Sequence, residues 1–279
     1  MSTLMLLILA AALPAGEKTL PLSDGVEMAY VDRGTGDPAL VFVHCGNCRK
    51  EIWQETLDAF ADDHRVVAMD MPGYGRSSAA KREKSSIEGL GADVAALVDE
   101  LKLQRVVLVG NSLGGPVALE AAHRLGPKRV LGVVAVDTLH DVELKFPDEI
   151  WRRILDGYEQ DFVKTCDRMM LSLLPEDAPE NTKHRIDEET CGNEPRVAIA
   201  IHESFRTYDP SKALRDAGVP VVAINATRVP TAVDVNRKYA PSFEVILMEG
   251  VGHYPQVERP AEFQANLRRA LAALVKPRP

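Results

Sequence analysis

The stretch Gly110 to Gly115, which reads Gly-Asn-Ser-Leu-Gly-Gly, constrains the fold of this chain more than any other. It follows the apolar run 105–109, which predicts a buried strand, and it precedes segment 117–125, which predicts a helix ended by a Gly-Pro pair. A sharp turn between strand and helix brings backbone segments close together, so glycine on both sides of the serine fits this geometry. Ser112 therefore lies at the apex of the turn, beside a helix N-terminus whose free N–H groups favour negative charge.

This segment resembles the nucleophile elbow G-x-S-x-G of the α/β-hydrolase superfamily, matched here by Gly110, Ser112 and Gly114. The stretch 70–77, Asp-Met-Pro-Gly-Tyr-Gly-Arg-Ser, resembles the D-x-P-G-x-G-x-S loop of the same superfamily. The resemblance covers nearly all of residues 25–275 outside one inserted segment. It implies an α/β-hydrolase fold, a mostly parallel sheet with helices on both faces and a helical cap inserted between strands 6 and 7.

The order of apolar runs along the chain predicts the same architecture. An opening hairpin is followed by strands that alternate with helices, which is typical of a parallel sheet covered on both faces. We expect strands at 18–22, 27–31, 40–43, 65–69, 105–109, 130–136, 219–224 and 243–248. A capping box, Ser85 followed by Glu88, predicts the start of helix 87–101.

The predicted hydrolase core comprises residues 17–137 and 214–279, and residues 138–213 are predicted to form the helical cap. This segment is helical in pattern and too long for an ordinary connection, so we expect it to cover the carboxyl edge of the sheet. Its apolar side chains are as consistent with the cap's own core as with the lining of a pocket: Phe146, Trp151, Phe162, Met169, Met170 and Leu173. The substrate-binding residues are therefore not predicted.

A serine hydroxyl needs a neighbouring base and a group that orients that base. Histidine is the expected base, and His253 follows the last predicted strand on a glycine-flanked loop at the edge where the elbow opens. The resemblance implies that the backbone N–H groups of Gly46 and Leu113 form the oxyanion hole. Cys45 stands where the superfamily usually has glycine, and His44 is interpreted as a structural residue that holds this loop.

The orienting acid is where the sequence departs from its relatives. In most of them it follows the strand after the cap, where this chain has Thr227, which cannot carry charge. Some members carry the acid after the preceding strand, and Asp137 stands at that point. We expect the strands 130–136 and 219–224 to be neighbours in the sheet, so an acid at the end of either could reach His253, and Asp137 is the predicted acid. Asp141, Asp234 or the absence of an acid are the alternatives.

The N-terminus and the cysteines suggest an exported protein. Residues 1–16 contain an apolar run of about ten residues, too short to span a membrane and typical of a signal peptide. We therefore expect a secreted or periplasmic protein, otherwise a cytoplasmic one. In an exported chain, Cys166 and Cys191 could form a disulfide. Cys45 and Cys48 have C-x-x-C spacing, but no second pair completes a zinc site.

The leading functional hypothesis is a serine hydrolase of carboxylic esters, with a small-molecule ester as partner and no metal or organic cofactor. The net charge of -8 and the absence of a basic run argue against nucleic acid or an anionic membrane surface as the main partner. The apolar N-terminal run is too short to span a membrane, so no stable membrane insertion of the mature chain is expected. Lactonase, carbon–carbon bond hydrolase and perhydrolase chemistry remain open on the same site. A non-catalytic ligand-binding relative is the alternative from another class, and the sequence does not predict the oligomeric state.

Overall fold

The computed structural model describes residues 16–78 and 85–275. Its sheet has eight strands in the order β1-β2-β4-β3-β5-β6-β7-β8. The strands β1 and β2 form the predicted antiparallel hairpin, β2 pairs antiparallel with β4, and all later pairs are parallel. The strands are β1 (Glu17–Pro21), β2 (Glu27–Arg33), β3 (Ala39–Val43), β4 (Val66–Met69), β5 (Val106–Asn111), β6 (Val130–Val136), β7 (Val221–Ala226) and β8 (Glu244–Met248).

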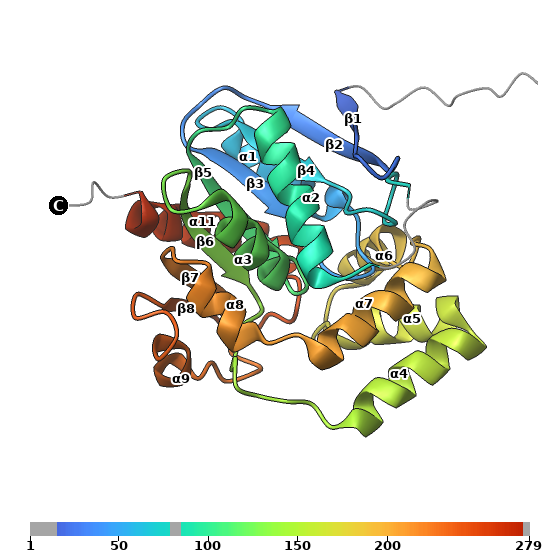
Figure 1. The fold of residues 1–279 in the computed structure, drawn as a ribbon. Coiled ribbons are helices and arrows are strands. Elements are labelled where there is room, and N and C mark those ends of the chain that lie inside the picture. The colour runs from blue at the N-terminus through green and yellow to red at the C-terminus, as the bar shows by residue number, and fades with distance from the viewer. Residues whose placement is uncertain (1–15, 79–84, 276–279) are drawn as a thin grey trace, which may run out of the picture.

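Helices cover both faces of this sheet (Figure 1). They are α1 (Gln54–Phe60), α2 (Ile87–Glu100), α3 (Gly114–Leu125), α4 (Asp148–Gln160), α5 (Phe162–Ser172), α6 (Glu180–Glu189), α7 (Pro195–Thr207), α8 (Pro210–Asp216), α9 (Val233–Arg237), α10 (Pro255–Glu258) and α11 (Pro260–Leu274), with a short 3-10 helix η1 (Lys50–Trp53) before α1. The capping residue of α2 differs from the prediction. Ser86, not Ser85, precedes its first residue, and the Ser86 side chain accepts a hydrogen bond from the N–H of Gly89.

The central strands are apolar on both sides because each side packs against a different layer of helices. Alternate residues of β3, such as Val41 and Val43, pack with α2, α3 and α8, whereas Leu40 and Phe42 pack with α1 and α11. Successive side chains of a strand point to opposite faces, so one apolar run supplies two cores. This explains why the strands have continuous apolar sequences rather than an alternating pattern.

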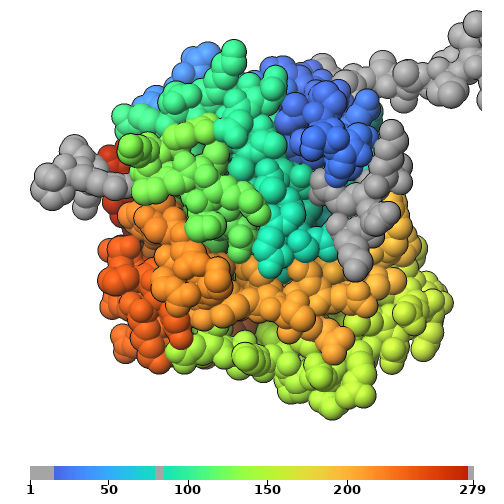
Figure 2. All heavy atoms as spheres, in the orientation of Figure 1, coloured from blue at the N-terminus to red at the C-terminus, as the bar shows by residue number. Residues whose placement is uncertain are grey.

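Helices α4 to α7, called here the helical insert, lie between β6 and β7 in the chain and gather at one end of the molecule (Figure 1). Figure 2 shows that the yellow-green and orange segments meet along the lower part of this face. The insert packs into both cores, with Tyr158 and Met170 in one and Val197 and Ile201 in the other. It occupies the place where a cap was predicted.

The predicted signal peptide, residues 1–16, lies outside the described residues except for its last position. Within 16–78 and 85–275, no helix combines the length and the apolar character needed to cross a membrane.

Candidate active site

Ser112 occupies the turn between β5 and α3 with a φ of 52°. This left-handed conformation is rare for a residue other than glycine and is common at functional sites. The backbone N–H of Ser112 donates to the carbonyl of Val136 at the end of β6 (3.0 Å). A Cβ atom on Gly110 would overlap the carbonyl of Gly114, and one on Gly114 would overlap the carbonyl of Val43. The tight packing of three backbone segments therefore accounts for both glycines of the elbow.

His253 lies on the loop between β8 and α10, and its side chain is 17% exposed. Its backbone N–H donates to the carbonyl of Leu173 just after α5 (3.1 Å). Glu258 fixes the loop from the other side, because its carboxylate accepts from the N–H groups of Gly252 (2.7 Å) and Tyr254 (2.9 Å). Burial raises the pKa of Glu258. The loop that carries the imidazole is thus held at His253 and at the residue on either side of it.

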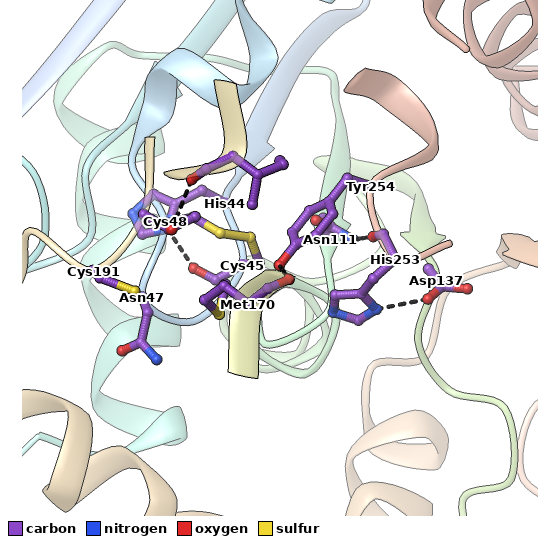
Figure 3. Close-up of a disulfide and its surroundings, with 12 residues drawn as sticks. His44, Cys45, Asn47, Cys48, Asn111, Asp137, Met170, Cys191, His253 and Tyr254 are labelled. Carbon is purple, nitrogen blue, oxygen red and sulfur yellow. Dashed lines mark hydrogen bonds and ion pairs between the residues drawn. A yellow bond between two sulfur atoms is a disulfide. The ribbon is translucent and has the colours of Figure 1, made fainter. Parts of the chain in front are cut away.

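The carboxylate of Asp137 lies against this imidazole. The distance from His253 Nδ1 to Asp137 Oδ2 is 2.6 Å (Figure 3). The other carboxylate oxygen, Asp137 Oδ1, accepts from the N–H of Ala226 (3.0 Å). Burial alone would raise the pKa of Asp137, but hydrogen bonds from His140, His253 and Ala226 outweigh it and hold the pKa well below its ordinary value of 3.8. The carboxylate is therefore charged at neutral pH, and it faces the imidazole nitrogen that a triad acid would orient.

The other candidate positions for the acid lie elsewhere. Thr227 is exposed, and its backbone N–H bonds to the carbonyl of Met248. Asp141 accepts from the N–H of Glu143 in its own turn (2.9 Å), and Asp234 is exposed on α9. The strands β6 and β7 are neighbours, as predicted, so a carboxylate at the end of β6 reaches the same histidine as one after β7.

Asn111 connects the elements that carry these residues. Its side-chain Nδ2 donates to the carbonyl of Val136 (2.9 Å) and to that of His253 (3.1 Å), and its Oδ1 accepts from Gln256 Nε2 (3.1 Å). Asn111 is fully buried and was missed in the sequence because it fills a variable position of the elbow motif.

Among residues 16–78 and 85–275, no hydrogen bond joins the hydroxyl of Ser112 to the imidazole of His253.

Gly46 and Leu113, the predicted oxyanion donors, lie next to each other. A Cβ atom on Gly46 would be 3.7 Å from Leu113 Cδ2. In the described part of the chain, the backbone N–H groups of Gly46 and Leu113 donate to no other protein group. Two unsatisfied N–H groups beside the elbow have the chemistry that an oxyanion requires.

His44 has a structural role, as interpreted from the sequence. Its Nδ1 donates to the carbonyl of Cys45 (2.7 Å), and its Nε2 accepts from the N–H of Met71 (2.9 Å). Both ring nitrogens are therefore used in a neutral imidazole, and complete burial lowers its pKa. The loop after β4 is anchored in a similar way, because Asp70 accepts from both the N–H (2.7 Å) and the Nζ (2.9 Å) of Lys50.

A disulfide joins Cys45 to Cys48 and spans the turn that contains Gly46 (Figure 3). The C-x-x-C pair is thus a structural bridge within the predicted oxyanion loop, a role that spacing alone did not indicate. The second disulfide joins Cys166 to Cys191, as the sequence suggested. The backbone N–H of Cys191 donates to the carbonyl of Asn47 (2.7 Å), so the helical insert and the loop are fastened together.

A cavity of about 1240 Å³ lies between the helical insert and the sheet edge. Its walls include Asp137 and His253 but not Ser112, so it opens beside the imidazole on the side of the carboxylate. Aromatic groups of the helical insert form part of its wall, where Trp151 of α4 stacks on Phe205 of α7 with ring centroids 5.9 Å apart. Most of the wall area is apolar, and many polar and charged side chains also reach the cavity. A concave site of this kind has room for a small molecule.

The six apolar insert residues left open by the sequence divide between these roles. Three line the cavity: Phe146, Trp151 and Leu173. The other three pack in or against the core that the insert shares with the sheet, α1 and α11: Phe162, Met169 and Met170. Within the described ranges, no group of three or more His, Cys, Asp and Glu side chains is arranged to hold a metal ion.

A family model described as "alpha/beta hydrolase fold" matches residues 38–260. The chain belongs to the α/β-hydrolase fold family. It is 27% identical over 248 residues to the pimeloyl-[acyl-carrier protein] methyl ester esterase of Yersinia enterocolitica serotype O:8, covering 82% of this chain and 92% of that protein. It is 25% identical over 262 residues to the dihydrolipoyllysine-residue acetyltransferase component of the acetoin cleaving system of Cupriavidus necator, covering 89% of this chain and 67% of that protein.

Solved structures show the same α/β-hydrolase fold. A thermophilic esterase from Thermogutta terrifontis superposes with a TM-score of 0.79 at 22% sequence identity, covering 94% of this chain and all of that one. This likeness extends the match beyond the range of the family model to nearly the whole chain.

Proposed function

We propose that this α/β hydrolase cleaves carboxylic esters through an acyl-enzyme formed on Ser112. The observation that carries the proposal is the 2.6 Å contact between His253 Nδ1 and the charged Asp137 carboxylate. The loop that carries His253 is hydrogen-bonded to the nucleophile elbow through Asn111. A carboxylate on Nδ1 leaves Nε2 free to accept a proton, which is the tautomer a general base needs. The similarity to a curated methyl ester esterase supports the choice of ester as substrate.

In the proposed mechanism, Ser112 Oγ attacks the acyl carbon of the ester while its proton passes to His253 Nε2. The negative oxygen of the tetrahedral intermediate accepts hydrogen bonds from the N–H groups of Gly46 and Leu113. The imidazolium, stabilised by Asp137, then protonates the departing alkoxide, and the alcohol leaves. Water, deprotonated by the same imidazole, hydrolyses the acyl-enzyme and regenerates the serine.

The strained φ of Ser112 and the helix that begins at Gly114 support its role as nucleophile. The tight turn keeps the serine in this strained conformation at the end of β5, and the helix N-terminus favours the developing negative charge. The cavity beside His253 provides space for one side of the substrate next to the proton acceptor.

A panel of p-nitrophenyl esters of increasing acyl length tests the proposal, with parent protein and Ser112→Ala measured side by side. We expect turnover by the parent and a loss of several orders of magnitude in kcat for the variant. Equal rates for the two proteins would contradict the assignment of Ser112. No turnover of any ester by the parent would favour the ligand-binding alternative.

A further inference from the structure

A second histidine contacts the Asp137 carboxylate. His140 lies three residues after Asp137, lines the cavity and has a side chain that is 18% exposed. Its Nε2 is 3.5 Å from Asp137 Oδ1, the oxygen opposite the one that faces His253. The triad mechanism does not require this residue, and its spacing from Asp137 matches no motif used in the sequence analysis.

The surroundings of His140 assign its tautomer. Its Nδ1 lies 3.3 Å from Asn225 Nδ2 and 3.5 Å from Thr231 Oγ1. The orientation of the Asn225 amide is set by Thr138, whose N–H donates to Asn225 Oδ1 (3.2 Å) and whose carbonyl accepts from Asn225 Nδ2 (3.2 Å). The shorter contacts of Asn225 Nδ2 go to Thr231 Oγ1 (2.9 Å) and to the Thr138 carbonyl, which together use both of its hydrogens. A proton on His140 Nδ1 would face this NH₂ group, which cannot accept it, so Nδ1 is assigned as the nitrogen without a proton. In the neutral imidazole the proton then resides on Nε2, directed at Asp137.

We propose that His140 is a positioning residue for the acid, holding the Asp137 carboxylate in the orientation in which Oδ2 faces His253. Two donors meet Oδ1, the backbone N–H of Ala226 at 3.0 Å and the ring N–H of His140. A carboxylate held at one oxygen by two donors has less freedom to turn its other oxygen away from His253.

An N–H donor at Oδ1 orients the carboxylate and also stabilises its negative charge. The low pKa of Asp137, to which the hydrogen bond from His140 contributes, is consistent with a carboxylate stabilised in its ionised form.

The size of the effect follows from the distance. A contact of 3.5 Å is longer than the usual N–H···O range, so its loss should cost less than the loss of the direct contact with His253. We expect His140→Leu to lower kcat about tenfold, the low end for a hydrogen bond to a charged group, with KM unchanged. His140→Gln, which retains an N–H donor, should recover most of this loss.

The kinetic test rests on the proposed esterase function, so a second readout that needs no turnover accompanies it. The proton between His253 Nδ1 and Asp137 should give a low-field ¹H NMR resonance, which His140→Leu should shift. His123→Leu is the matched control, because His123 is exposed on α3 and bonds only to the carbonyl of Asp216 among the described residues. If His140→Leu does not fold, His140→Asn, whose amide is too short to reach Asp137, replaces it with the same expectations.

The outcomes separate the two claims. Lower kcat with unchanged KM and melting temperature, recovered in His140→Gln, supports the positioning role. A parent-like kcat in His140→Leu, or equal losses of kcat and thermal stability in the Leu and Gln variants, overturns it. If the parent hydrolyses no ester, the proposed function fails, and the low-field ¹H resonance alone tests the positioning role of His140. A shift of this resonance in His140→Leu but not in His123→Leu supports that role, and no difference between the two variants overturns it.

Discussion

Replacing Asp137 by asparagine tests the arrangement around His253 most informatively. Asp137 Oδ1 accepts from the N–H of Ala226, and Oδ2 faces His253 Nδ1. An asparagine in the same place would keep its carbonyl oxygen toward Ala226, because a backbone N–H requires an acceptor. Its NH₂ group would then point at His253 Nδ1, which would have to accept and would leave the proton on Nε2. That tautomer cannot take a proton from Ser112.

The expected loss is therefore large although the change in shape is small. Asp137→Asn should lower kcat by roughly 10³- to 10⁴-fold, as in the corresponding change in serine proteases. This corresponds to about 4 to 5.5 kcal/mol of transition-state stabilisation. Steady-state hydrolysis of a p-nitrophenyl ester gives kcat and KM, and thermal melting shows whether the variant is folded.

Two matched variants serve as controls. Asp141→Asn changes a carboxylate that lines the same cavity, and Thr227→Asn changes the position where relatives carry the acid. Both should stay within about tenfold of the parent, since neither contacts His253 among the described residues. A small effect of Asp137→Asn, or a larger effect of Thr227→Asn, would refute the reasoning.

Three further predictions follow from the loop after β3 and from the N-terminus. The double variant Cys45→Ser/Cys48→Ser should lower kcat by about tenfold or more by loosening the turn that contains Gly46; unchanged kinetics would contradict this. Because burial lowers the pKa of His44 below its ordinary 6.5, the unfolded chain binds more protons as the pH falls through that value. The free energy of unfolding should then fall by up to about 1.4 kcal/mol per pH unit below 6.5, and the fall should be smaller in His44→Asn; urea titrations that give equal falls would contradict this. If the N-terminal segment directs export, intact-mass measurements on protein from the native host should give a chain that begins near residue 16 and gains about four hydrogens on reduction; a full-length chain with free thiols would contradict export.

The sheet could be predicted from the sequence because its strands are separate apolar runs with clear turn signals between them. All eight strands lie where these runs predict them, and the opening hairpin and the β6–β7 pairing are confirmed. The start of α2 at Ile87 was predicted correctly, but its capping residue was wrong by one position, since Ser85 and Ser86 are both good capping residues and only backbone geometry distinguishes them.

The candidate site was only partly predictable. Ser112 and His253 follow from motif and chain order, and the contact between Asp137 and His253 follows from the expected strand order. The contribution of Asn111 depends on contacts between segments far apart in the chain. That of His140 depends on a contact three residues away in an irregular loop, for which no sequence pattern was used. The catalytic roles of these residues and the designation of the insert as a cap remain predictions.

The central claim is that Ser112 is a nucleophile activated by His253. Reaction with a fluorophosphonate, followed by peptide mass spectrometry, tests this claim most directly because it detects the covalent bond at the serine whatever the natural substrate. We expect stoichiometric labelling of the peptide that contains Ser112, much slower labelling in His253→Ala, and none of that peptide in Ser112→Ala. Labelling at another residue, or equally fast labelling of Ser112 without His253, would contradict the account.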